Sequence, residues 1–189
     1  MIIDGFFIER LTQELNQTLA YARLEKVSQI NASSFLFNYY RRGKKYKLVL
    51  NLFANDYRLY LSHKTFKPVE QSQFLNSLKK HIEGSILTSI TQHLNDRVML
   101  FHFDVNDFIF GLQKFTLVFE AMGKHANLLL IKDNIIIDTY KKMFFEEGRQ
   151  LLPQAKFEYF PTTKKSYESI DYSNVESPRA LSLTYMGIS

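Results

Sequence analysis

The stretch KFTLVFEAMGKHANLLLIKDNIIIDTY, residues 114–140, decides the fold because it holds three consecutive strand signals. In its first part, every second residue from Phe115 to Ala121 is apolar, and the opposite positions, such as Glu120, are mostly polar. Alternation with a period of two is typical of a strand that is buried on one face. The dipeptide 133–134 (Asp-Asn) then separates two apolar runs, and both residue types tolerate the positive φ of a tight hairpin turn. The stretch therefore predicts antiparallel strands at 114–122, 126–131 and 135–140.

Earlier strand-like runs fall into two groups. They lie at 23–30, 34–41, 45–53 and 57–62, and then at 85–93 and 97–104. A helix is predicted before and after the first group, at 5–20 with Asp4 as its N-cap and at 71–82 with Gly84 ending it. Strands that follow one another in runs argue against a doubly wound parallel sheet. We therefore expect an α+β fold, with two antiparallel β-sheets or a sandwich, an N-terminal helix and an inserted helix.

Composition excludes several kinds of site. The 189 residues contain no cysteine, so the chain has no disulfide framework, no thiolate zinc site and no cysteine nucleophile. The five histidines lack metal-ligand spacing, and neither a Gly-rich phosphate loop nor the G-x-S-x-G motif occurs. We therefore expect no metal, no cofactor and no catalytic residue, and the chain is predicted not to be an enzyme.

The N-terminal sequence MIIDGFFIER carries an Asp and a Glu, so it lacks the basic start and uninterrupted apolar run of a signal peptide. No other window approaches the roughly 20 apolar residues that a membrane-spanning helix needs. We expect a cytoplasmic protein with no membrane partner.

The positive charge is concentrated in one segment. The chain has a net charge of +5, but residues 21–67 carry ten Lys or Arg against Glu25 and Asp56, a surplus of +8. The densest part, YYRRGKKYK at 39–47, places aromatic residues beside cations, which suits binding to a nucleic-acid backbone. The alternative is a solvated hairpin with Gly43 at its tip, basic for solubility and to block edge pairing. Both interpretations remain open at this point.

Five blocks in order resemble a known family. They are DGFFIERLTQELN (4–16), KKHIEGSI (79–86), LNDRVMLFHF (94–103), FEAMGKHANLLLI (119–131) and LLPQAKFEYFP (151–161). Together they resemble the N-terminal NFACT domain of the RqcH/NEMF family, which is also called the fibronectin-binding protein A N-terminal domain. The resemblance implies an NFACT-N domain over residues 1–161. It also implies a polar linker or tail at 162–189 that leads into a missing helix-hairpin-helix region, which YMGIS at the chain end resembles.

The resemblance implies a function in ribosome-associated quality control. Such proteins bind a large ribosomal subunit that carries a stalled peptidyl-tRNA, and they recruit a tRNA, alanyl-tRNA in bacteria, for C-terminal tailing of the nascent chain. The implied partners are therefore tRNA, the large subunit and its rRNA, while the ribosome itself makes the peptide bond. The implied fold is similar to the N-terminal domain of formamidopyrimidine-DNA glycosylases.

The family pattern singles out two pairs of residues. Asp96 and Arg97 match an Asp-Arg pair that is associated with tRNA binding, and the alternative is a plain hairpin turn at Asn95-Asp96. In a turn the two side chains can project together, so the turn and the site are compatible. Lys124 and His125 are the second tRNA-binding candidates, and Lys124 stands where the family commonly has Arg. Diffuse phosphate contacts are predicted for a basic set on the first hairpin: Arg41, Arg42, Lys44 and Lys45.

Three other functions are compatible with parts of the pattern. A DNA glycosylase of the similar fold needs Pro-Glu after the initiator Met, and this chain has Ile2-Ile3, so that chemistry is not expected. A fibronectin-binding adhesin follows from the family's other label, and a protein-docking module needs no RNA at all. RNA binding should weaken steeply as the salt concentration rises, which separates it from apolar protein contacts.

Overall fold

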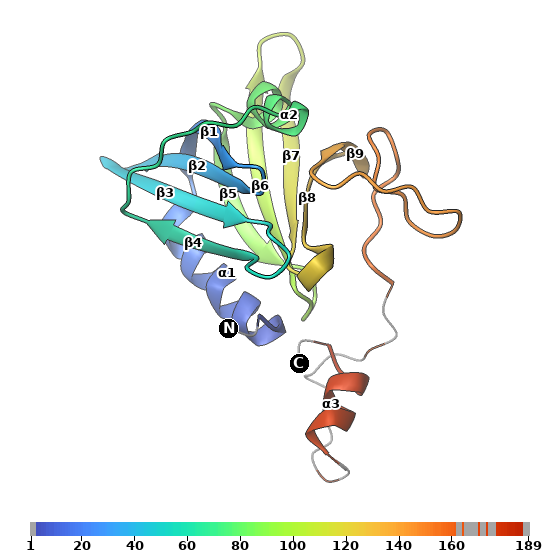
Figure 1. Cartoon of the computed structure of the whole chain (residues 1–189). Helices are drawn as coiled ribbons and strands as arrows, with labels where there is room; N and C mark the ends of the chain where they lie inside the picture. Colours follow the sequence, from blue (N-terminus) through green and yellow to red (C-terminus); the bar gives the residue numbers. More distant parts are fainter. Residues whose placement is uncertain (1–2, 162–163, 165–169, 171–172, 174–176, 187–189) are drawn as a thin grey trace.

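A computed structural model describes residues 3–161, 164, 170, 173 and 177–186. The predictions made for Ile2, for most of the tail and for the end of YMGIS fall outside the described residues. Nine strands form one antiparallel sheet in the order β4-β3-β2-β1-β5-β6-β7-β8-β9 (Figure 1). The strands are β1 Ala22–Asn31, β2 Ser34–Arg41, β3 Lys44–Asn51, β4 Arg58–Ser62, β5 Ile86–Gln92, β6 Val98–Asp107, β7 Gly111–Glu120, β8 Asn127–Lys132 and β9 Ile135–Thr139. The helices are α1 Gly5–Leu19, α2 Gln73–Ile82, a short 3-10 helix η1 Gly123–His125, and α3 Pro178–Thr184 in the predicted tail.

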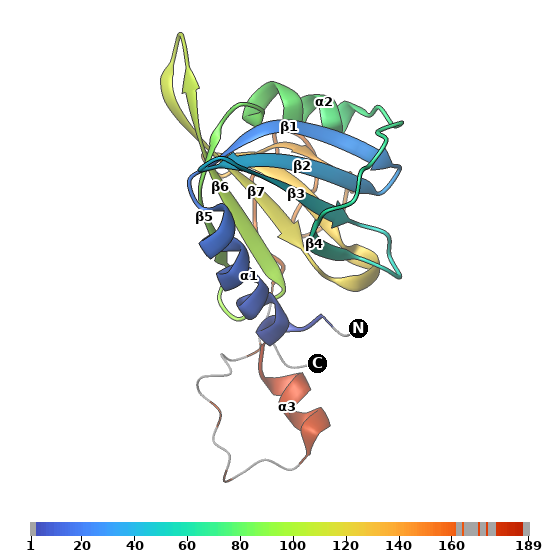
Figure 2. The same ribbon diagram turned by 90° about the vertical axis from the view of Figure 1, so that its left-hand side faces the viewer.

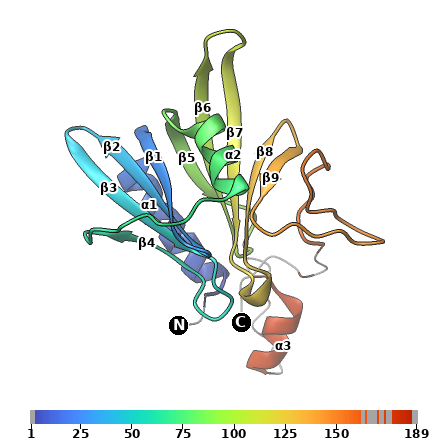
Figure 3. The same cartoon turned by 45° about the horizontal axis from the view of Figure 1, so that its top comes forward.

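The predicted strands and both predicted helices are confirmed, but the prediction of two separate sheets is wrong. β1 pairs with β2 along most of its length, and it also pairs with β5 at Ala22↔Leu87 and Arg23↔Ile86. This two-residue junction joins the strand groups into one hydrogen-bonded sheet. Because the junction is so short, the halves β1–β4 and β5–β9 diverge beyond it and open around α2 (Figure 3).

The inner faces of the two halves share one hydrophobic core. Phe35 and Phe37 of the first half and Phe101 and Phe119 of the second are at most 1% exposed. The predicted inner face is confirmed, since the four alternating apolar residues, three in β7 and Ala121 directly after it, all belong to this core. α1 packs against β5 and β6, while α2 packs mainly against β1 and also contacts β6 and β9 (Figure 2). The helices thus cover the openings that the bent sheet leaves.

A carboxylate at the end of α2 completes the junction. β1 has a bulge between Leu24 and Lys26, and the nearby backbone N–H of Val27 donates to Glu83 Oε2 at 3.0 Å. Gly84, in the left-handed conformation with φ +87°, donates its N–H to the Leu24 carbonyl at 2.7 Å. Gly84 therefore ends α2 as predicted, and the turn it forms fastens α2 to β1 beside the bulge.

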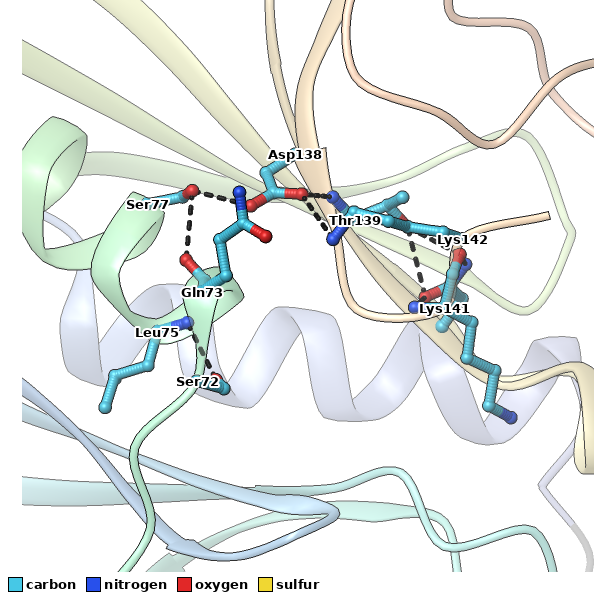
Figure 4. Close-up of polar contacts among 9 residues, drawn as sticks. Ser72, Gln73, Leu75, Ser77, Asp138, Thr139, Lys141 and Lys142 are labelled. Carbon is cyan, nitrogen blue, oxygen red and sulfur yellow. Dashed lines mark hydrogen bonds and ion pairs between the residues drawn. The ribbon is translucent and has the colours of Figure 1, made fainter.

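α2 is also fastened to β9 at the other half of the sheet (Figure 4). Ser77 Oγ donates to Asp138 Oδ2 at 2.6 Å, and the other carboxylate oxygen accepts the Thr139 N–H at 2.9 Å. Asp138 also pairs with Lys142 Nζ at 3.3 Å, although its side chain is only 4% exposed. These contacts fix the start of the chain segment that leaves β9, which includes Lys141.

Residues 143–160 return over the outer face of β6–β9. Leu151 and Phe157 pack there with Val98, Val118 and other outer-face residues in a second hydrophobic cluster. At the end of β7, Glu120 is fully buried and forms a bidentate ion pair with Arg149, with N···O distances of 2.7 and 2.8 Å. This ion pair ties the returning segment to the sheet.

We expect Glu83→Ala to lower the free energy of unfolding by about 1–3 kcal/mol, because it leaves the N–H of Val27 without its acceptor. Val27 is fully buried, so water cannot replace the lost bond without rearrangement. Urea unfolding measures the change. Glu83→Gln is the control, since its amide oxygen can still accept this bond, and equal destabilisation by both variants would contradict the role assigned to the acceptor.

Arg149→Met should destabilise the chain by about 3–5 kcal/mol, because it leaves the Glu120 carboxylate buried without a counterion. The double variant Glu120→Leu, Arg149→Met removes both charges and should recover a large part of that loss. Chemical denaturation of the two proteins side by side tests the expectation. A double variant that is as unstable as the single one would show that the ion pair is not the main contact.

Candidate nucleic-acid interface

The turn between β5 and β6 carries the predicted residues Asp96 and Arg97. It is closed by a hydrogen bond from the Asp96 N–H to the His93 carbonyl at 3.1 Å. The prediction of a turn is confirmed, but the residue with positive φ is Leu94, at 50°, rather than Asn95 or Asp96. This backbone conformation is unfavourable for Leu94, because a leucine side chain lacks the local hydrogen bond that an Asn or Asp could form there. The turn is thus held by the residues on either side of it.

The side chain of Asp96 accepts a hydrogen bond from the backbone of its own turn. Its Oδ1 accepts the N–H of Arg97 at 2.7 Å, and among the described residues no ion pair joins their two side chains. Gln92 Nε2 donates both to the Asp96 carbonyl at 2.7 Å and to the Gly5 carbonyl at 2.9 Å, which links the turn to the start of α1. Both predicted side chains are half-buried, so they are held by the protein and still reachable from solvent.

An aromatic stack lies at the same turn. The rings of His93 and Tyr159 are parallel within 3°, with centroids 3.4 Å apart, and Phe157 packs edge-on against Tyr159. Burial lowers the pKa of His93, against an opposing effect from the Asp96 charge. Burial also raises the pKa of Tyr159, assisted by the negative charge of Glu120. At neutral pH both rings are therefore uncharged, and this half-buried stacked pair, the His93–Tyr159 platform, lies beside the turn.

The second predicted pair lies next to the first. Gly123, with φ +57°, begins η1, which displays Lys124 and His125 as exposed side chains. The N–H of Ala121 donates to the Arg97 carbonyl at 2.8 Å, so the two turns are hydrogen-bonded neighbours. The structure therefore brings the four predicted tRNA-binding residues to one end of β6–β8.

A cavity of about 450 Å³ adjoins η1. Its walls include Lys124, His125, Lys141, Phe145, Arg149 and Phe160. Lys141 Nζ donates to the Lys124 carbonyl at 3.0 Å, and burial lowers the pKa of this ammonium group. The cavity thus combines three cationic side chains, those of Lys124, Lys141 and Arg149, with two phenyl rings.

Arg149 builds one wall of the cavity. Besides the ion pair with Glu120, its Nη1 donates to the Glu158 carbonyl at 3.1 Å, and its Cζ lies 3.7 Å from the centroid of the Phe160 ring. Sequence reasoning missed this cluster because Glu120 was assigned to a polar face. The available signal was a single carboxylate between apolar neighbours, Phe119 and Ala121, near the end of a long strand.

The hairpin between β2 and β3, called the basic hairpin below, carries the predicted phosphate-binding residues and lies away from these two turns. Arg41 Nη1 donates to the carbonyls of Gln17 and Thr18 at 2.8 and 2.9 Å, so Arg41 caps the C-terminus of α1, where a cation is stabilising. Arg42, with φ 48°, forms the tight turn with Gly43. The exposed cations are Arg42, Lys44 and Lys45. They lie at the end of α1 opposite to the Asp96 turn, and α1 itself, with 15 residues, is about 22 Å long.

The described residues contain neither a metal-binding cluster nor a membrane-spanning helix. Within residues 3–161 and the shorter described segments, no group of three or more His, Asp or Glu residues could hold a metal ion. Of the helices in the described part of the chain, none combines the length and apolar character needed to cross a membrane.

Comparison with known proteins places this geometry in a family. Residues 4–189 match the family model described as NFACT N-terminal and middle domains. The "Rqc2 homolog RqcH" of Bacillus subtilis is 31% identical over 170 residues, which cover 87% of this chain and 30% of that protein. The "Ribosome quality control complex subunit 2" of Schizosaccharomyces pombe is 29% identical over 96 residues, or 51% of this chain and 9% of that protein. The chain thus spans less than a third of the length of these two relatives.

Comparison of the fold with solved structures agrees with the sequence matches. The solved N-terminal domain of the fibronectin-binding protein PavA from Streptococcus pneumoniae superposes with a TM-score of 0.90 at 25% identity, covering all of this chain and 76% of that one. Family model, relatives and fold lead to the same assignment. The chain belongs to the family of NFACT N-terminal and middle domains, whose relatives include ribosome quality-control subunits.

Proposed function

We infer that the chain is the tRNA- and ribosome-binding part of a ribosome-associated quality-control factor. In this role it binds the large subunit that carries a stalled peptidyl-tRNA and recruits a tRNA, such as alanyl-tRNA, for C-terminal tailing of the nascent chain. The domain binds and positions RNA and performs no catalysis. The observation that carries the proposal is the hydrogen-bonded contact between the Asp96-Arg97 turn and the turn that displays Lys124 and His125.

The chemistry of this end of the sheet suits RNA. Arg97 supplies a half-buried guanidinium for a phosphate or a base edge, and Lys124 adds an exposed cation. The His93–Tyr159 platform offers a flat surface to an unpaired base, which is how single-stranded RNA is usually recognised. Asp96 acts by fixing the turn, because its carboxylate holds the Arg97 N–H.

The basic hairpin supplies a second, less specific contact. Arg42, Lys44 and Lys45 are exposed and carry no acidic neighbour between them in the sequence. Exposed cations on a turn attract phosphates without reading bases. The length of α1 separates this contact from the Asp96 turn, so an RNA that touches both must extend along this side of the molecule.

Fibronectin binding is the second candidate, and the fold comparison favours it. The structural neighbour PavA is described as a fibronectin-binding protein, and it covers the whole of this chain. An adhesin contact and an RNA contact differ in their salt dependence. Counterion release makes RNA binding fall steeply with salt, whereas burial of apolar surface does not.

The double variant Asp96→Ala, Arg97→Ala should weaken binding of labelled tRNA by roughly 5- to 150-fold, which corresponds to losing one arginine contact of about 1–3 kcal/mol. Fluorescence anisotropy at two salt concentrations measures the loss. The matched control is Asp56→Ala, Arg58→Ala, which removes the same residue types from an exposed pair in the other half of the sheet. Binding that survives in the first variant, or falls equally in the control, would refute the assignment of this turn.

The triple variant Arg42→Gln, Lys44→Gln, Lys45→Gln should weaken binding to all RNA sequences alike. The slope of log K against log salt should become shallower by about 2–3, since each lost phosphate contact removes roughly 0.7–0.9. Lys80→Gln, Lys114→Gln, Lys156→Gln is the control, because it removes the same charge from exposed positions outside the hairpin. An unchanged slope in the hairpin variant would leave the hairpin with a solubility role only.

A further inference from the structure

The hairpin between β6 and β7 carries a group of apolar side chains that neither the core nor the proposed RNA contacts use. Phe108, Ile109 and Phe110 form its turn, and they are 104%, 80% and 75% exposed. Leu112, near the start of β7, is 54% exposed. These four residues are called the apolar tip below. Single exposed apolar residues are normal, but a contiguous group of them marks a site that contacts an apolar partner.

The apolar tip stands clear of the rest of the molecule. β5 pairs with β6 only up to Asp104, and β8 pairs with β7 only from Thr116 onward. Beyond these two residues, β6 and β7 pair with each other alone as far as Asp107↔Gly111. The hairpin therefore ends as a two-stranded ribbon that projects past α2 and the neighbouring strands (Figure 1, Figure 2).

The turn that displays the apolar tip is fixed by hydrogen bonds. Asp107 Oδ1 accepts the N–H groups of Ile109 and Phe110, both at 2.8 Å, and Gln113 Nε2 donates to the Phe110 carbonyl at 3.1 Å. The bond from the Phe110 N–H, followed by that from the Ile109 N–H, lowers the pKa of the Asp107 carboxyl, which stays ionised at neutral pH. Because these backbone groups are satisfied within the hairpin, the cost of moving the turn out of water is reduced.

The chemistry and the position of the apolar tip separate it from the proposed RNA contacts. Residues 105–113 contain no Lys, Arg or His, so the tip itself cannot neutralise a phosphate. The Asp96-Arg97 turn precedes β6 at its other end, and a strand of ten residues is about 33 Å long. The tip can therefore contact a second partner while RNA occupies the opposite end of β6.

The shape of the apolar tip favours lipid over a protein surface. Consecutive side chains do not point the same way, and none of the three turn residues is covered, so the tip is apolar on more than one side. A protein surface covers one side of such a tip, whereas the acyl region of a bilayer surrounds it. The four side chains offer roughly 600 Å² even when fully buried, which is less than the about 800 Å² that each partner gives to a stable protein interface.

Cations lie at the base of the hairpin, below the apolar tip. The Lys114 side chain is 76% exposed, and its ammonium group pairs with Asp104 at 3.3 Å. The last turn of α2 reaches the hairpin through His81, whose ring centroid lies 5.5 Å from that of Phe115, and it carries the exposed Lys80. Together with the net charge of +5 of the whole chain, these lysines favour an anionic lipid surface.

We propose that the apolar tip inserts into the interface of an anionic phospholipid bilayer. Phe108, Ile109 and Phe110 enter the boundary between headgroups and acyl chains, at the depth of roughly 5–10 Å that interfacial segments reach. Lys80 and Lys114 then lie at the level of the lipid phosphates. The expectation of no membrane partner rests on the lack of a spanning segment, and a contact in the interface needs none.

The double variant Phe108→Ser, Phe110→Ser should weaken binding to vesicles of equal parts phosphatidylcholine and phosphatidylglycerol by roughly 100-fold, because burial of each phenylalanine is worth a factor of roughly ten. Vesicle sedimentation of the 189-residue chain measures this. Tyr21→Ser, Phe53→Ser is the matched control, since these aromatic side chains are 73% and 55% exposed and lie outside the hairpin. Equal binding by the two double variants, or no binding by the unchanged chain, would overturn the proposal.

The absence of tryptophan from the chain allows a direct readout of insertion. Phe108→Trp places a single fluorophore at the apolar tip, and Phe53→Trp places one in the other half of the sheet. With the same vesicles, we expect a blue shift of the Phe108→Trp emission and quenching by brominated acyl chains, and neither for Phe53→Trp. Unchanged emission of Phe108→Trp, as expected for a tip that binds a protein instead, would contradict insertion.

Two further measurements separate this inference from the proposed function and from attraction by charge alone. The Phe108→Ser, Phe110→Ser variant should bind labelled tRNA as tightly as the unchanged chain, and loss of both ligands would contradict the separate placement of the two contacts. Part of the vesicle binding should survive in molar salt, because burial of apolar surface is not screened. Binding that salt abolishes completely would show an electrostatic contact only, and the apolar tip would then have no part in it.

The two proposals also fail separately. If tRNA binding needs Asp96 and Arg97 while Phe108→Trp does not respond to vesicles, the membrane inference is wrong and the proposed function stands. If Phe108→Trp inserts and tRNA does not bind, the proposed function is wrong and the apolar tip is a lipid contact.

Discussion

The end of the molecule that carries the candidate RNA-binding residues depends on the buried ion pair between Glu120 and Arg149. Two charges away from water are costly unless each is fully paired, and here the pairing is bidentate and the Arg149 guanidinium also lies over Phe160. The partners are 29 residues apart in the chain, so the pair closes a long loop. It fixes the segment that carries Tyr159 and Phe160, and this gives the platform and the cavity their walls.

A second constraint is the short junction between β1 and β5. Two paired residues are enough to continue the hydrogen bonding of the sheet, but they are too few to keep the halves in one plane. The bulge after Leu24 and the Glu83 carboxylate satisfy the backbone where β1 leaves β5. The consequence is that α1 runs from the Asp96 turn to the basic hairpin, and its length sets the distance between the two candidate RNA contacts.

The sequence predicted what depends on local chemistry. Alternation placed the strands, Asp4 and Gly84 marked helix ends, and the Asp133-Asn134 hairpin has the expected positive φ at both residues. It could not predict contacts between distant segments. From the sequence, Glu120 is expected on a solvent-exposed strand face, but the segment 149–160 covers it. Arg41 is expected to be a free cation, but it binds the last carbonyls of α1. The two-residue junction of the sheet has no signal of its own.

The positions of the cations indicate different roles in RNA binding for the two ends of α1. Exposed cations such as those of the hairpin attract any phosphate, and their effect decays with ionic strength over about 8 Å at physiological salt. Arg97 and Lys141 are held partly out of water by fixed hydrogen-bonded neighbours, so their interactions are screened less and have a defined direction. In the proposed function, attraction without base preference is therefore the role of the hairpin. Discrimination between RNAs requires fixed donors and rings, and those lie at the end that the Glu120–Arg149 pair holds together.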